Sequence, residues 1–175
     1  MVIDSLPDFI IERNKLFEEL WQQYLEEVKN KPHPEINVTL DLGNGNTSVV
    51  PAKAWETTPG QLLKNVPKEV SASVVIAKVD GELFDLNRPL ERECTVAYVP
   101  FEHPEGREVF WHSSAHCLGE ACECQYGCLL SHGPPTPQGF FYDMAMPDKY
   151  VTFTLQAAIF FLGWMGLTSL QPRRS

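Results

Sequence analysis

The sequence predicts an α+β protein, because its hydrophobic pattern changes twice along the chain. Between residues 7 and 30 apolar side chains recur every three or four positions, as in an amphipathic helix. From Ile36 to residue 99 most segments alternate with a period of two, as in half-buried strands. After residue 106 a helical pattern returns and leads into an aromatic, strand-like segment.

The composition limits the classes of protein that the chain can belong to. The 175 residues suffice for one ordinary domain or two small ones, and 43% hydrophobic with 21% charged residues is typical of a globular protein. The net charge of −9 excludes a general nucleic-acid coat, which needs a positive surface. The first residues, MVIDSLPDFIIERNKLF, resemble neither a signal peptide nor a transit peptide, so we expect a cytoplasmic protein.

The cysteines indicate reduced thiols. An odd number, with four of the five crowded around one predicted helix, fits a disulfide framework poorly. We favour small buried thiols on a packed helix face. The alternative is a zinc site formed by Cys117, Cys124 and Cys128 with His112 or His116. The five cysteines are Cys94, Cys117, Cys122, Cys124 and Cys128.

Residues 7–30 are predicted to form an amphipathic helix that packs on a neighbour. Pro7 and Asp8 suit its first turn, and Lys29 lies near its end. The run KNKPHPE (29–35) breaks the helix, since Pro32 and Pro34 cannot continue it. We assign residues 1–34 to this helix and a linker.

Residues 35–66 are predicted to contain a hairpin followed by a helix. GNGN (43–46) supplies residues that tolerate positive φ between two strand patterns. Thr57, Thr58 and Pro59 mark the start of a helix that Pro67 ends. Its inner face is formed by Leu62, Leu63 and Val66.

Three further strands are predicted at 74–79, 82–86 and 94–99, with a tight turn at Asp80-Gly81. The order ββαββ over about 65 residues describes a small β-grasp, or ubiquitin-like, domain, a size that folds alone. We place this domain at residues 35–101. The run PFEHPEG (100–106) is predicted to be a second linker.

The stretch FWHSSAHCLGEACE (110–123) carries the strongest chemical signal. In a helix over 107–127, His112 and His116 are one turn apart, so both imidazoles can point at one spot. Such a pair can bind a metal, or accept a proton from water and hydrogen-bond a substrate. The alternative is that the pair serves packing. A Pro/Gly-rich loop (131–146) then enters the aromatic segment.

Residues 151–170 contain no charge. Twenty such residues at about 1.5 Å rise would just cross a bilayer core of about 30 Å. Threonine, serine, glutamine and glycine dilute the segment, so a membrane anchor is the less favoured interpretation. A buried or poorly ordered tail is the alternative, and we treat residues 148–175 as a divergent apolar tail.

These motifs together resemble the N-terminal part of threonyl-tRNA synthetases of the cytosolic eukaryotic, fungal-like type. WETTP (55–59), AKVDGELFDL (77–86) and RPLE (88–91) resemble the TGS domain of that family, a β-grasp module. FWHSSAHCLGEACE and GPPTPQGFFYDMAM (133–146) resemble the start of its editing domain, here residues 102–147. The resemblance covers roughly residues 6–146.

The resemblance implies a function for the histidine pair. In the family, the editing domain hydrolyses serine wrongly attached to the threonine tRNA, and His112 and His116 match its HxxxH histidines. Threonine and serine differ by one methyl, worth only about 1–3 kcal/mol of discrimination, so a second hydrolytic step is physically reasonable. We therefore predict His112 and His116 as catalytic residues, with no metal ligand and no cofactor-binding residue in this sequence.

The sequence also departs from the family. No CxxxH element, which completes the editing pocket, follows Met146. The aminoacylation core, to which ATP, magnesium and zinc belong, is missing, so the chain alone is expected to be inactive. From about Pro147 the sequence resembles nothing in the family, and either a gene-model artefact or a genuine short isoform would explain it.

Two alternatives to an editing fragment stay open. One is a non-catalytic TGS module that contacts tRNA weakly, or binds a synthetase partner. The other is a membrane-tethered fragment held by residues 151–170. The basic residues available for RNA are few and scattered, namely Lys53, Lys64, Lys68, Lys78 and Arg88.

Overall fold

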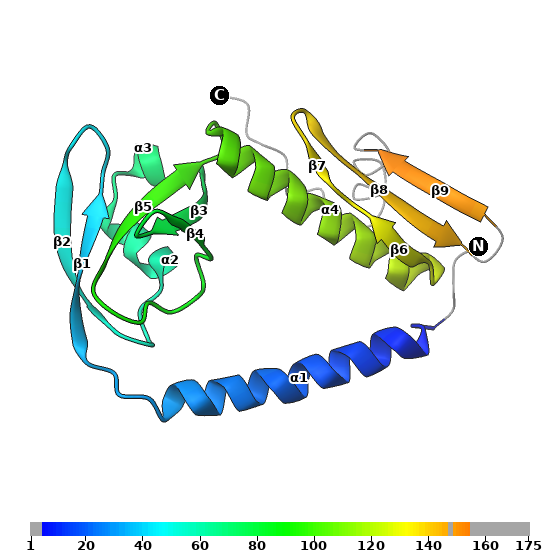
Figure 1. Ribbon diagram of the computed structural model, residues 1–175, viewed down its shortest axis with the longest axis horizontal. Coiled ribbons are helices and arrows are strands. Elements are labelled where there is room, and N and C mark those ends of the chain that lie inside the picture. Colours follow the sequence, from blue (N-terminus) through cyan, green and yellow to red (C-terminus); the bar gives the residue numbers. More distant parts are fainter. Residues whose placement is uncertain (1–4, 147–148, 155–175) are drawn as a thin grey trace. The chain divides into compact units, whose positions relative to one another are not determined.

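A computed structural model describes residues 5–146 and 149–154 (Figure 1). The chain divides into two compact units, one formed by Arg13–Phe110 and the other by Met1–Glu12 with Trp111–Ser175. The helices and strands in the first part of the chain are α1 (Asp8–Lys29), β1 (Glu35–Asp41), β2 (Thr47–Lys53), α2 (Pro59–Leu62), η1 (Leu63–Asn65) and α3 (Lys68–Ser71). They are followed by β3 (Val74–Val79), β4 (Glu82–Phe84), β5 (Cys94–Pro100), α4 (Pro104–Tyr126), β6 (Leu129–His132), β7 (Pro135–Thr136), β8 (Gly139–Met146) and β9 (Lys149–Thr154).

The N-terminal helix is confirmed as α1. Asp8 in its first turn and Lys29 in its last turn both favour the helix dipole. The helix was expected to pack its apolar face on a neighbour, but Ile10 is the single buried residue in α1. The other large apolar side chains that should have packed on a neighbour are exposed; they include Leu16, Phe17, Leu20, Trp21 and Leu25.

The β-grasp sheet is confirmed, with five strands in the order β2-β1-β5-β3-β4. β1 and β2 form the predicted antiparallel hairpin, whose turn holds Asn44 at φ 54° and Gly45 at φ 78°. β5 inserts between β1 and β3, parallel to β1 and antiparallel to β3. All five strands were predicted by their residue ranges, although the order ββαββ names only four of them. The fully buried core side chains include Val38, Leu40, Ala77 and Val96.

The helix predicted after Thr58 is split. α2 begins with a capping box, in which Gln61 N–H donates to Thr58 Oγ1 (3.3 Å) and Thr58 N–H donates to Gln61 Oε1 (3.1 Å). The helix then tightens into the 3₁₀ segment η1 at Leu63. Pro67 ends that segment, as predicted, and also precedes the short helix α3, which the sequence pattern had not indicated.

Trp55 adopts a conformation that the pattern did not reveal. Its φ is 62°, in the left-handed region that a bulky residue rarely occupies. Two contacts hold it there. The Trp55 N–H donates to the Leu90 carbonyl at 2.6 Å, and the Lys31 ammonium lies 3.4 Å from the centre of the ring. Through Trp55, the WETTP motif contacts both Lys31 of the first linker and Leu90 of the core.

The second unit has a small sheet packed on α4. Its order is β6-β8-β7, with β9 also paired to β8 (Figure 1). Two expectations were wrong here. The segment predicted as a linker contains the first turn of α4, which begins at Pro104 because proline suits a first helical position. The Pro/Gly-rich loop contains the end of β6 and all of β7. The aromatic segment that follows it is strand β8, which pairs with β6, β7 and β9.

The membrane-anchor interpretation falls largely outside the described residues. Residues 151–154 belong to strand β9, and residues 155–175 are not described. Within residues 5–146 and 149–154, no helix has both the length and the apolar character needed to span a bilayer.

The capping box generates a stability prediction. Thr58→Ala removes the side-chain oxygen that receives the Gln61 N–H and should lower the free energy of unfolding of the β-grasp unit by about 1 kcal/mol. Hydrogen exchange of the β1 and β5 amides in the full chain measures this change. Thr47→Ala, at an exposed position outside the box, is the control. Equal effects of the two substitutions would contradict the role of the cap.

Candidate functional site

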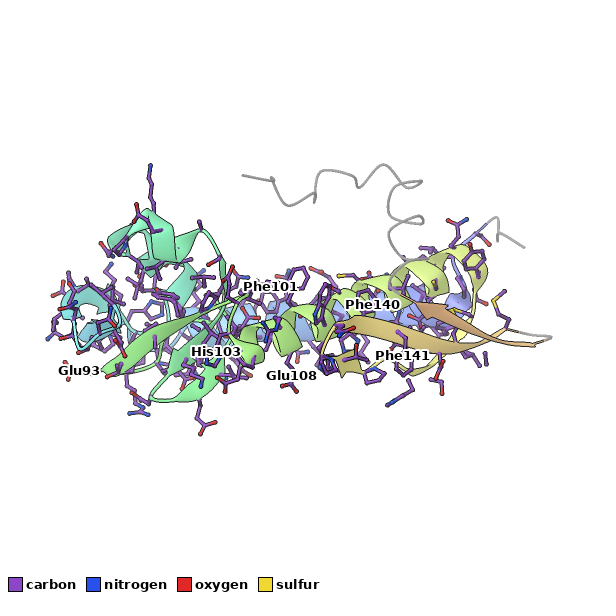
Figure 2. The ribbon with its side chains drawn as sticks, turned by 90° about the horizontal axis from the view of Figure 1, so that it is seen from above. Glu93, Phe101, His103, Glu108, Phe140 and Phe141 are labelled. Carbon is purple, nitrogen blue, oxygen red and sulfur yellow. The ribbon has the colours of Figure 1, made fainter. Side chains whose placement is uncertain are left out.

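The helix that carries the histidine pair begins on the β-grasp unit. The His103 Nδ1 accepts the Glu105 N–H at 3.3 Å, which caps the first turn of α4. Glu105 also pairs with Lys78 of β3 at 2.7 Å, and the hydrogen bond from Lys78 lowers the pKa of the Glu105 carboxyl. Phe101 precedes this cap in the sequence and Phe110 follows it, and the centroids of their rings lie 5.1 Å apart in an edge-to-face contact. Figure 2 shows Phe101 and His103 where β5 passes into α4.

The structure brings His112 and His116 together on α4. Their ring centroids are 4.7 Å apart, with an angle of 25° between the planes. Both side chains are exposed, whereas Ala115, Leu118 and Cys122 on the other side of the helix are buried. The packing alternative is therefore unfavourable, since the imidazoles lie outside the core of this unit. Two parallel imidazoles this close can share one hydrogen-bonded water or ligand.

Tyr142 of β8 lies beside the pair, and the sequence pattern had treated it only as sheet packing. Its ring meets the His116 ring at 6.4 Å and 67°. The side chain is 7% exposed, and burial, with Glu123 as a second cause, raises the pKa of the Tyr142 phenol. The candidate site therefore comprises an aromatic side chain from β8 as well as the two histidines of α4.

Two glycines make room for this tyrosine. A Cβ added at Gly133 would lie 2.3 Å from Tyr142 Cε2, and one added at Gly119 would lie 2.9 Å from the same atom. Neither approach is compatible with a larger residue unless the ring moves. Gly119 was the signal that could have identified this position, because a lone glycine inside a helix often has a packing reason.

The structure does not bring the residues of the zinc alternative together. Within residues 5–146 and 149–154, no three His, Cys, Asp or Glu side chains lie close enough to hold an ion. Cys122 and Cys128 are buried, as the favoured interpretation predicted, but Cys117 is exposed and Cys94 and Cys124 are only partly buried. Burial, with Cys128 as a second cause, raises the pKa of the Cys122 thiol to about 12.

Most of the basic residues considered for RNA contact are already paired. Lys53 lies 3.6 Å from Glu56, Lys78 lies 2.7 Å from Glu105, and Arg88 lies 2.9 Å from Glu91. Each pair reduces the positive potential that could attract a phosphate. Lys64 of η1 and Lys68 of α3 are exposed.

Comparison with known proteins bears on the β-grasp unit and on the family of the chain. Residues 38–99 match the TGS domain family, so the five-stranded unit defines the chain as a TGS-domain protein. The chain is 41% identical over 153 residues to "Threonine--tRNA ligase, cytoplasmic" of Saccharomyces cerevisiae, covering 85% of this chain and 20% of that protein. It is 44% identical over 156 residues to "Threonine--tRNA ligase 2, cytoplasmic" of Homo sapiens, covering 87% of this chain and 19% of the relative.

A third relative, "Threonine--tRNA ligase, mitochondrial 1" of Arabidopsis thaliana, is 45% identical over 140 residues and is covered to 19%. The chain belongs to the threonyl-tRNA synthetase family and matches the N-terminal region of its members. It spans about a fifth of the length of these relatives.

The cysteine environments generate a prediction about thiol reactivity. At pH 8 an alkylating reagent should modify exposed Cys117 well before Cys122, because only the thiolate reacts. A shift from the usual 9.0 to about 12 leaves about a thousandfold less Cys122 thiolate. Since pH 8–10 lies below that raised pKa, the Cys122 rate should climb about tenfold per pH unit.

Mass spectrometry of quenched time points gives the rate at each cysteine. In urea, all five cysteines should react at similar rates, which is the control for intrinsic reactivity. Native Cys122 reacting as fast as Cys117 would show that the α4 core is open.

Proposed function

We propose that this chain supplies the N-terminal module of a threonine–tRNA ligase, in which His112 and His116 act in the hydrolysis of seryl-tRNA. The observation that carries this proposal is the parallel, exposed imidazole pair on α4, directly after a TGS domain. The similarity to proteins named threonine–tRNA ligases supports the substrate class.

The geometry suits ester hydrolysis. One imidazole can accept the proton of an attacking water, while the other, 4.7 Å away, orients that water or the substrate hydroxyl. Tyr142 forms the wall next to His116. A site of this kind would remove serine after attachment, where binding alone discriminates weakly against a missing methyl.

The chain by itself is expected to show no ligase activity and very weak hydrolysis. The sequence holds no glycine-rich phosphate loop or arginine-rich ATP site, and no CxxxH element after Met146. Half a pocket neither holds the ester nor keeps out bulk water. We propose a cytoplasmic location and no cofactor for this chain.

A graft tests the histidine roles. Residues 6–146 of this chain replace the matching region of the yeast relative, and the release of serine from seryl-tRNA is timed. His112→Ala or His116→Ala should slow release at least about 100-fold, because each removes a proton-transfer or orienting group. Threonylation of tRNA by the same variants should be unchanged.

His33→Ala is the matched control, since this histidine lies in the other unit and contacts the Val28 carbonyl at 2.9 Å. Unchanged serine release in both α4 variants would overturn the proposed role. The 175-residue chain assayed alone should release serine no faster than buffer does.

A second candidate function is weak, non-catalytic RNA binding by the TGS unit. The observation that favours it is the pair of exposed lysines, Lys64 and Lys68, on neighbouring short helices. Two phosphate contacts against a net charge of −9 would give only salt-sensitive binding.

A salt titration tests this candidate. The slope of log K against log salt for tRNA should be about −2 for two contacts, and Lys64→Ala with Lys68→Ala should abolish it. Lys53→Ala, at a lysine already paired with Glu56, is the control and should change little. Absence of binding at low salt would exclude this function.

A further inference from the structure

α1 carries an apolar surface that the described part of the chain leaves uncovered. Five side chains, at successive spacings of one, three, one and four residues, form one broad stripe along the helix, which we call the α1 stripe. Each is between 43% and 62% exposed, far more than a helix docked on its own core would show. The α1 stripe consists of Leu16, Phe17, Leu20, Trp21 and Leu25.

Aromatic rings in and beside the stripe stack on one another. The rings of Phe17 and Trp21 stack at 6.1 Å and 9°, and Trp21 stacks in turn on Tyr24 at 5.3 Å and 28°. Stacked aromatics lose little further rotamer freedom on binding, and aromatic side chains dominate the energetics of interfaces. A contiguous exposed patch of this kind is typical of a protein–protein contact.

The charges beside the stripe decide what can cover it. At 100° per residue, Glu12 lies along one border of the stripe and Glu18 lies along the other, next to Lys29. Within the arc of the stripe, Arg13 lies near the start of the helix and Glu27 lies near its end. The helix as a whole has six acidic residues (Asp8, Glu12, Glu18, Glu19, Glu26, Glu27) and three basic ones (Arg13, Lys15, Lys29).

These charges disfavour two occupants. An anionic lipid surface binds helices with lysine and arginine on the polar face, and here the polar face is mainly glutamate. A second copy would bring acidic borders against acidic borders, and like charges at such positions are unfavourable. A helix whose apolar face is bordered by lysine or arginine satisfies both the stripe and the glutamates.

We propose that the α1 stripe is the docking surface for a basic amphipathic helix of another protein. The partner lays its apolar face on Phe17, Leu20 and Trp21, and its lysine or arginine side chains pair with Glu12, Glu18 and Glu27. This docking is independent of the histidine pair on α4.

Synthetic peptides test the proposal on the full chain. One labelled 22-residue helical peptide has leucine at the first and fourth positions of each heptad and lysine at the fifth and seventh; a second has glutamate in place of lysine. Fluorescence anisotropy at 150 mM salt should show at least a tenfold preference for the basic peptide. Leu20→Ser with Trp21→Ser should abolish binding, and Leu83→Ser, at an exposed residue of β4, should not.

Charge reversal shows whether the preference for the basic peptide comes from the glutamates of α1 or from the net negative charge of the whole chain. Glu12→Lys, Glu18→Lys and Glu27→Lys together should transfer the preference to the acidic peptide. Glu69→Lys, Glu82→Lys and Glu108→Lys alter the net charge equally at exposed positions outside α1 and should leave the preference unchanged.

Three results would overturn the proposal. The first is no binding of either peptide, and the second is an equal effect of the two charge-reversal sets. The third is self-association in sedimentation that Leu20→Ser with Trp21→Ser removes, because the occupant would then be a second copy of this chain.

Discussion

The parallel pairing of β1 with β5 is the constraint on which the TGS unit depends. Val38 pairs with Cys94 and Leu40 pairs with Val96, so strands more than fifty residues apart in the chain form the middle of the sheet. Both partners of the second pair are fully buried. A parallel pair needs a long connection, and the segment between β2 and β3 supplies the covering helices. β5 then runs directly into α4, so the same strand that completes the sheet also fixes where the histidine-bearing helix begins.

In the second unit, close packing between α4 and β8 has a comparable role. The Tyr142 ring occupies the space that glycines at positions 119 and 133 leave free. With the ring seated there, Leu118 and Cys122 of α4 turn toward Met144 of β8, and the imidazoles remain on the outer side of the helix. The aromatic wall beside His116 is thus a consequence of how the unit packs.

Periodicity predicted those elements whose local pattern was unambiguous. The hairpin at GNGN, the strand Val74–Val79 and the long helix α1 follow from positive-φ residues, alternation and a repeat near 3.6. It failed where a local pattern was overridden. The Pro/Gly-rich segment before β8 contains the end of β6 and all of β7 because β8 offers backbone partners along its length. The second linker became helix because Pro104 and the His103 cap start α4 early.

The sequence by itself determined the α+β class, the order of the helices and strands of the β-grasp domain and the one-turn spacing of His112 and His116, because these follow from local patterns of residues. Tertiary structure decided which groups surround them. It paired Lys53, Lys78 and Arg88 with glutamates, placed Tyr142 beside His116, and left the apolar face of α1 exposed. Such neighbours are set by packing between distant segments, and no periodic pattern within one segment encodes them.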